Sequence, residues 1–129
     1  MLRTTMSMLM FSVCCALFAQ GGAQLTAVKE MTPQELSTRL GQVQVIDVNE
    51  EDNFGFAHVP GAKLLAYDGI TADVLAANRS DTLVFYCWSP ECPAAGMAAE
   101  TAAGLGFTEV YWMKAGITGW QDAGFPTEP

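Results

Sequence analysis

Positive charge is scarce in this sequence. The 129 residues include six Lys and Arg against fourteen Asp and Glu, and the formal net charge is −8. A protein that binds nucleic acid or an anionic membrane needs a basic face to meet the phosphate groups, and so few cations cannot form one. The composition therefore excludes nucleic acid and anionic lipid as partners.

The apolar run near the start of the chain is too short to span a bilayer comfortably. Residues 8–19 are largely apolar, follow the cationic Arg3 and precede small residues at 21–23. This order is typical of a secretory signal peptide. We expect a signal peptide at 1–23 and a mature domain at 24–129. The expected destination is a bacterial periplasm, without stable membrane insertion after cleavage. An N-terminal membrane anchor is the alternative that the length disfavours.

Cysteine is also scarce once the predicted signal peptide is removed. Cys14 and Cys15 leave with it, and the loss of Arg3 leaves five cationic residues against fourteen acidic ones, a net charge of −9. The two remaining cysteines are Cys87 and Cys92. In an exported protein such a pair is by default a structural disulfide, but the short proline-containing loop between them makes closure dependent on geometry.

Strand and helix signals alternate along the rest of the chain. Strands are predicted at 43–48, 82–86 and 109–113, a short apolar piece at 63–66, and helices at 33–40, 71–77, 93–105 and 117–123; the acidic stretch 49–56 is predicted to be an irregular, solvated loop. The alternation indicates an α/β fold, a parallel sheet with helices on both faces. Repeats and internal linkers are absent from the sequence, so we expect one domain.

Cys87 occupies a chemically favourable position in this pattern. It directly follows the apolar run 82–86, and the loop 87–92 leads into the next helix. In parallel sheets, ligand sites lie beyond the carboxyl ends of the strands. Loop N–H groups and the positive end of the helix dipole would stabilise an anion on this sulfur. A buried, inert cysteine that ends a core strand is the alternative.

Six short segments, taken in their order along the chain, form a pattern. They are VIDV at 45–48, AHVPGA at 57–62, VFYC at 84–87, GFTEV at 106–110, AGITGW at 115–120 and AGFP at 123–126. Together they resemble the rhodanese-like (sulfurtransferase) domain family over residues 27–126. The resemblance implies a three-layer α/β sandwich around a five-stranded parallel sheet. It also implies that Cys87 carries sulfur as a persulfide between a small sulfane-sulfur donor and a thiophilic acceptor, with no cofactor and no metal.

The departures from this family are concentrated in the loop. Trp88 and Cys92 stand where active members often have arginines, Glu91 adds a negative charge, and Pro90 removes a backbone N–H. Trp88, Ser89 and Glu91 are the candidate substrate-binding residues. Because they supply no positive charge, we expect thiosulfate to be a poor donor.

The residues leave two functions open. In the first, the protein is a sulfurtransferase in which Cys87 is the nucleophile and Cys92 is a resolving thiol that releases hydrosulfide. In the second, it is a non-catalytic module whose two cysteines form a reversible disulfide or bind a soft ion such as Cu(I). A static disulfide is the structural alternative for the pair.

One related activity can be excluded, and two polar residues are predicted to be structural. Phosphatases with this fold need an arginine six positions after the cysteine, and here that position is Pro93. His58 is expected to make a structural hydrogen bond in its turn, and Asp47 to cap a strand end beneath the site. Asn49 stands where the family often has an arginine.

Overall fold

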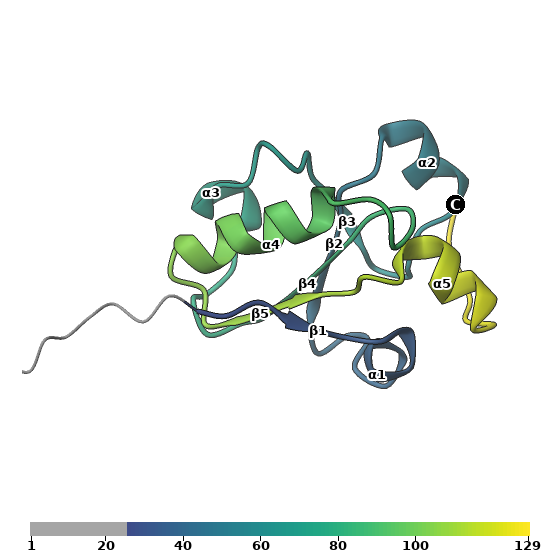
Figure 1. Cartoon of the computed structure of the whole chain (residues 1–129), viewed down its shortest axis with the longest axis horizontal. Coiled ribbons are helices and arrows are strands. Elements are labelled where there is room, and N and C mark those ends of the chain that lie inside the picture. Colours follow the sequence, from purple (N-terminus) through teal and green to yellow (C-terminus); the bar gives the residue numbers. More distant parts are fainter. Residues whose placement is uncertain (1–25) are drawn as a thin grey trace, which may run out of the picture.

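The computed structural model describes residues 26–129, so the predicted signal peptide, Cys14 and Cys15 lie outside the described residues. The chain alternates between strands and helices (Figure 1). The elements are β1 (Lys29–Glu30), α1 (Pro33–Ser37), β2 (Gln44–Asp47), α2 (Glu51–Phe56), β3 (Lys63–Leu64), α3 (Ala72–Leu75), β4 (Thr82–Tyr86), α4 (Ala94–Gly104), β5 (Glu109–Trp112) and α5 (Gly116–Asp122).

The strands form one parallel sheet in the order β1-β5-β4-β2-β3. β4 lies at its centre, and the residues Leu83 to Tyr86 are all fully buried. A strand with partners on both edges and helices over both faces must be apolar throughout, as the run at 82–86 indicates. The predicted five-stranded parallel sheet is therefore confirmed.

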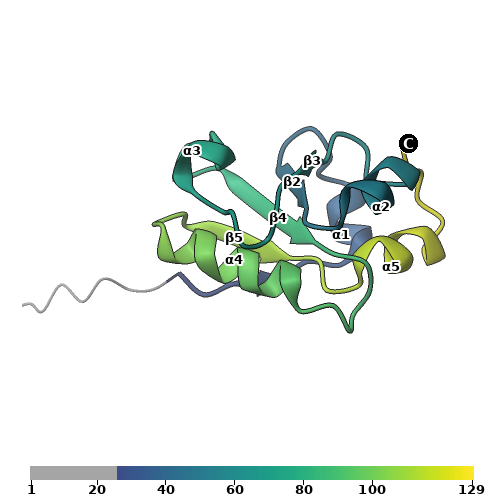
Figure 2. The ribbon, with the colours of Figure 1, turned by 90° about the horizontal axis from the view of Figure 1, so that it is seen from above.

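Two hydrophobic clusters occupy the two faces of the sheet. Leu83, Phe85 and Cys87 belong to the cluster under α3 and α4. Val84 and Tyr86 point to the opposite face and pack with residues of α1 and α5. Figures 1 and 2 show α4 and α1 on opposite sides of the sheet, which gives the predicted three-layer sandwich.

Local capping signals set several helix boundaries. Thr32 and Glu35 form the reciprocal capping box that their spacing predicts, and Thr71 caps α3. α1 ends earlier than the predicted residue 40. The hydroxyl groups of Ser37 and Thr38 donate to carbonyls of the preceding turn, which competes with continuation of the helix.

One predicted segment needs correction, and one strand was not predicted. The stretch 49–56 is not irregular, because Glu51–Phe56 forms α2. Its apolar residues lack a helical period, but Glu51 and Asp52 in the first turn are favourably placed in the helix dipole. β1 was not indicated by the sequence at all, since it has only two exposed residues and is a strand through its pairing with β5.

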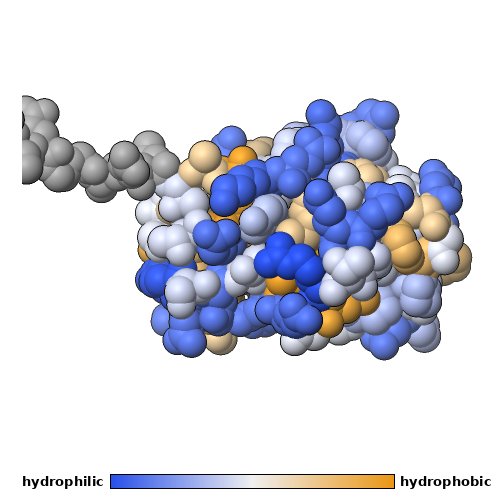
Figure 3. Space-filling view, turned by 90° about the horizontal axis from the view of Figure 1, so that it is seen from below, coloured by the Kyte–Doolittle hydropathy of each residue, from blue (hydrophilic) through white to orange (hydrophobic). Residues whose placement is uncertain are grey.

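The face that carries α1 is mostly hydrophilic, and its hydrophobic residues lie in small separate areas (Figure 3). In the described part of the chain, none of the helices is long and apolar enough to cross a membrane.

Candidate active site

The loop that follows β4 is anchored to the start of α5. The carbonyl oxygen of Cys87 accepts a hydrogen bond from the N–H of Ile117, and that of Trp88 accepts one from Thr118, both at 3.0 Å. The first N–H groups of a helix have no partner within the helix. These two contacts therefore provide hydrogen-bond partners both for N–H groups of α5 and for carbonyl groups of the loop. Cys87 is thereby held at the carboxyl end of β4, where the sequence predicted the site. Figure 2 shows α2 and α5 near this end of β4.

Gly116 permits this close approach. Its φ is +69°, and a Cβ at this position would lie 2.6 Å from the carbonyl carbon and oxygen of Trp88. Real Cβ atoms do not tolerate such a distance from backbone, so only glycine allows the loop and α5 to meet here.

Cys87 and Cys92 are joined by a disulfide, with their Cα atoms 6.2 Å apart. The loop turns back on itself because the N–H of Cys92 donates to the carbonyl of Ser89 at 3.0 Å. That N–H is therefore engaged within the loop rather than directed at an anion. Cys87 is 6% exposed, whereas Cys92 is half-buried. The structure thus holds the oxidised form of the pair.

The disulfide opens onto a small depression of about 250 Å³. Trp88, 40% exposed, contributes to its lining, as do Asn49 and Tyr67 from loops after the neighbouring strands. Oδ1 of Asn49 lies 3.6 Å from Sγ of Cys87. These side chains surround the sulfur atoms with amide and aromatic groups.

Ser89 and Glu91 interact with each other in the outer part of the loop. A hydrogen bond from the Ser89 side chain, and then one from the backbone N–H of Glu91, lower the pKa of the exposed Glu91 carboxyl. Glu91 therefore stays ionised at neutral pH and places a negative charge beside the cysteine pair.

A buried polar network lies directly beneath the site. The hydroxyl of Tyr86 donates to Oδ2 of Asp47 at 2.6 Å and accepts from the N–H of Val59 at 3.0 Å. Oδ1 of Asp47 accepts from the N–H of Asn49 at 2.7 Å. Burial raises the pKa of Asp47 against the opposing effect of these hydrogen bonds, and burial together with the nearby Asp47 raises the pKa of Tyr86. The network fixes the loop that carries Asn49, which confirms the structural role predicted for Asp47.

His58 is also structural, as predicted. Its Nδ1 donates to the carbonyl of Phe54 at 2.9 Å, and its ring stacks on the Phe54 ring with centroids 3.9 Å apart. The backbone of His58 pairs with Glu128 near the end of the chain. These contacts close the turn after α2 and leave the ring away from the lining of the cysteine depression.

Asn49, Tyr67 and Gly116 also belong to the site, although they are not among the site residues predicted from the sequence. Asn49 follows the short strand β2, and Tyr67 follows the short strand β3. Their positions after strands could have indicated them, because the carboxyl ends of parallel strands meet at one edge of the sheet. Gly116 follows β5 in the same way.

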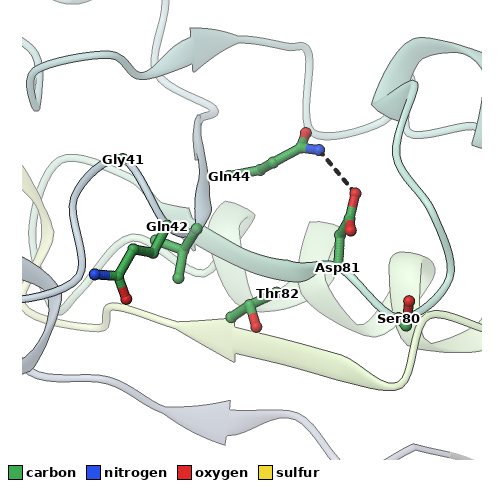
Figure 4. Close-up of a pocket in the computed structure, with 7 residues that line it drawn as sticks. Gly41, Gln42, Gln44, Ser80, Asp81 and Thr82 are labelled. Atoms are coloured by element: carbon green, nitrogen blue, oxygen red, sulfur yellow. Dashed lines mark hydrogen bonds between the residues drawn. The ribbon is translucent and has the colours of Figure 1, made fainter.

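A larger depression, of about 340 Å³, lies at the opposite end of the sheet. Figure 4 shows its lining, in which Nε2 of Gln44 donates to Oδ2 of Asp81 at 3.3 Å. The Asp81 carboxylate also accepts from the N–H of Asn78. Its polar groups bind one another, and its place at the amino ends of the strands separates it from the cysteine pair.

Residues 32–123 match the family model of the Rhodanese-like domain, and the chain belongs to this family. It is 27% identical to the thiosulfate sulfurtransferase GlpE of Ectopseudomonas mendocina over 105 residues, which cover 81% of this chain and 94% of that protein. It is also 27% identical to the YqhL protein of Bacillus subtilis, over 75% of each chain. Among solved structures, the BH2092 protein of Bacillus halodurans is similar with a TM-score of 0.70 and 26% identity, over 78% of this chain and 76% of that one.

Proposed function

We propose that the protein is an exported sulfurtransferase that carries sulfane sulfur as a persulfide on Cys87. The observation that carries the proposal is the position of this cysteine at the carboxyl end of β4, in a loop held by α5 and followed by α4. Membership in the rhodanese-like family and the similarity to a thiosulfate sulfurtransferase support it. Export is supported by the signal-peptide pattern at 1–23, which lies outside the described residues.

The proposed reaction begins with the reduced pair. The Cys87 thiolate attacks the outer sulfur of a sulfane donor, the S–S bond of the donor breaks, and the donor leaves as sulfite or as a thiolate. Cys92 then attacks Sγ of the Cys87 persulfide, and the outer sulfur leaves as hydrosulfide. The product is the Cys87–Cys92 disulfide, the form that the structure contains. An external thiol compound must reduce this disulfide before the next turnover.

Electrostatics disfavour an anionic donor. The ionised Glu91 lies in the loop itself, and Glu50 lines the depression in front of the cysteine pair. A dianion such as thiosulfate is repelled by these carboxylates, while a donor of lower negative charge is repelled less. We therefore propose an organic persulfide rather than thiosulfate as the preferred class of donor.

The disulfide itself favours a second candidate, a thiol-redox module without sulfur transfer. A pair that lies at the surface of a depression, with one half-buried member, is open to thiol–disulfide exchange. In this case the same two cysteines act, but the sulfur atoms exchanged all belong to cysteines.

Intact-mass measurement of cysteine variants separates the two candidates. The reduced domain and its Cys87→Ser and Cys92→Ser variants are exposed to cysteine persulfide, an organic donor of lower negative charge, and, separately, to thiosulfate. We expect wild type to take up sulfur and then return to the disulfide with release of hydrosulfide. Cys92→Ser should accumulate one extra sulfur atom on Cys87, and Cys87→Ser should gain none.

The redox module and the static disulfide each predict a different outcome of this measurement. If no form gains sulfur but wild type exchanges its disulfide with added thiols, the redox module is the correct function. If neither reaction occurs and both substitutions lower the free energy of unfolding equally, by no more than about a few kcal/mol for so small a loop, the disulfide is only structural.

Export has its own test. N-terminal sequencing of the protein purified from its native host should begin near Gln24, and a retained Met1 would refute cleavage.

A further inference from the structure

The disulfide lies at one end of a longer groove. Its depression adjoins a second one of about 350 Å³, and the two share Val48, Asn49, Glu50 and Tyr67 in their lining. The combined groove, here called the exchange groove, runs from the Cys87–Cys92 pair across the carboxyl end of β2 to the segment after β3. A small thiol occupies only the first depression, whereas several residues of an extended peptide are needed to fill both.

Two aromatic side chains are exposed along this groove. Trp88 is 40% exposed beside the disulfide, and Tyr67, 43% exposed, lies where the two depressions meet. Half-exposed aromatic side chains around a concave surface are enriched at sites that bind proteins, because they bury a large area at a small cost in side-chain entropy.

The charge on the exchange groove is of one sign. Its lining includes Glu50, Glu51 and Asp68, and in the described part of the chain no Lys, Arg or His lines either depression. The nearby Lys63 is turned away, since its Nζ donates to the carbonyl of Val74 in α3. A partner segment that carries positive charge would therefore be attracted, and anionic thiols such as glutathione would be repelled.

We propose that the exchange groove binds an extended, cationic segment of a partner protein, and that a cysteine in this segment reduces the Cys87–Cys92 disulfide. The proposal rests on the proposed function, in which the disulfide must be reduced between turnovers. The charge complementarity of the groove and its aromatic rim identify the occupant as a polypeptide rather than a small thiol.

The accessible sulfur determines the order of the reaction. The partner thiolate attacks Sγ of Cys92, the half-buried member of the pair, and the bond to the buried Cys87 breaks. Cys87 leaves as a thiolate and Cys92 forms a mixed disulfide with the partner. A second partner thiol then attacks the partner's own sulfur, which leaves a disulfide in the partner and two thiols, after protonation, in this protein. The partner is oxidised by two electrons and the pair is reduced by two.

The test uses two cysteine peptides of equal length that differ only in their flanking residues, lysine in one and glutamate in the other. For each peptide, we measure the rate at which it reduces the oxidised wild-type domain and the rate at which it reduces an uncharged low-molecular-weight disulfide. The first rate is divided by the second. This division removes the intrinsic difference between the two thiols. We expect the lysine peptide to be faster by about tenfold at low salt, with the difference largely lost near 1 M salt, where screening acts over about 3 Å.

Two charge-matched variants locate the effect. Glu50→Gln with Glu51→Gln removes two charges from the groove, and Glu100→Gln with Asp122→Asn removes two from exposed positions on α4 and α5 outside its lining. Glu50 makes no capping hydrogen bond to α2, so its substitution removes no cap from this helix. The preference for the lysine peptide should fall to a few-fold in the groove variant and stay unchanged in the other.

If both variants lose the preference for the lysine peptide equally, the preference depends on the net charge of the protein and not on the groove. This result would overturn the proposal. So would reduction by glutathione as fast as by the lysine peptide. Because no sulfane donor is present, the assay is independent of sulfur transfer. Sulfur loading without a peptide preference would refute only the groove, and a preference without sulfur loading would refute only the sulfurtransferase.

Discussion

Gly116 lies against the backbone of Trp88 so closely that a Cβ would stand 2.6 Å from the Trp88 carbonyl. The contact joins the first residue of α5 to the loop that bears the cysteine pair. The hydrogen bonds from Ile117 and Thr118 to the same loop depend on it. The position of Cys87 is therefore set by a helix that follows it by almost thirty residues.

Substitution of Gly116 by alanine should disrupt this contact. Gly124→Ala is the matched control, since Gly124 has a similar φ of +82° but nothing within 4 Å of a Cβ. The free energy of unfolding of this control should fall by about 1–2 kcal/mol, because alanine is strained in the left-handed backbone conformation. Urea unfolding of Gly116→Ala should show a larger decrease in the free energy of unfolding. This variant should also re-form the Cys87–Cys92 disulfide more slowly after reduction. Equal losses in the two variants would show that the loop accommodates the methyl group.

Removal of the Tyr86 hydroxyl should destabilise the fold. Tyr86→Phe leaves Oδ2 of the buried Asp47 without a donor and the Val59 N–H without an acceptor. We expect a loss of about 1–3 kcal/mol in the free energy of unfolding. Tyr111→Phe is the control, because its hydroxyl contacts Glu109 only at 3.5 Å in a less buried position. That variant should change by about 0.5 kcal/mol or less, and a similar loss in both would contradict the role of the network.

The titration of Asp47 should appear in the pH dependence of stability. Burial raises the pKa of its carboxyl in the folded state above the ordinary value of 3.8. The folded state therefore binds this proton more tightly than the unfolded state does, and the corresponding stability is present below pH 3.8 and is lost as the pH rises through the folded pKa.

Urea denaturation of wild type and Asp47→Asn at a series of pH values measures this effect, since the other carboxyl groups cancel in the difference. The free energy of unfolding of wild type minus that of the variant should decrease as the pH rises from below 3.8. A constant difference, or one that increases, would be inconsistent with a raised pKa.

The charge of Glu91 should control the use of thiosulfate. Glu91→Arg replaces an ionised carboxylate in the cysteine loop by a cation and leaves the disulfide partner Cys92 in place. In a thiosulfate:cyanide assay of the reduced protein, we expect KM for thiosulfate to fall by about 3- to 10-fold with little change in kcat, because the cation binds the donor before reaction. Glu100→Arg makes the same charge change on α4 away from the loop. If it lowers KM equally, the effect is one of net charge and not of the site.

Local features of the amino-acid sequence were sufficient to predict the class of fold and the main candidate site residue, Cys87. The almost wholly apolar run at 82–86 became the central strand β4 with the predicted bounds, and Cys87 lies directly after it. Thr32 and Thr71 cap helices as their spacing indicates. These features depend on a few neighbouring residues, so local propensity and hydrophobic pattern are sufficient to predict them.

The surroundings of Cys87 could not be predicted in the same way, because they come from elements that are distant from it along the chain. Asn49 and Tyr67 approach it because β2 and β3 follow β4 in the order of the sheet, and Gly116 does so because α5 packs against the opposite face. The sheet order results from the burial of both faces at once, and no short stretch of sequence encodes it. The same holds for the disulfide, whose closure depended on how the loop turns between Ser89 and Cys92 once both of its ends were fixed by the core.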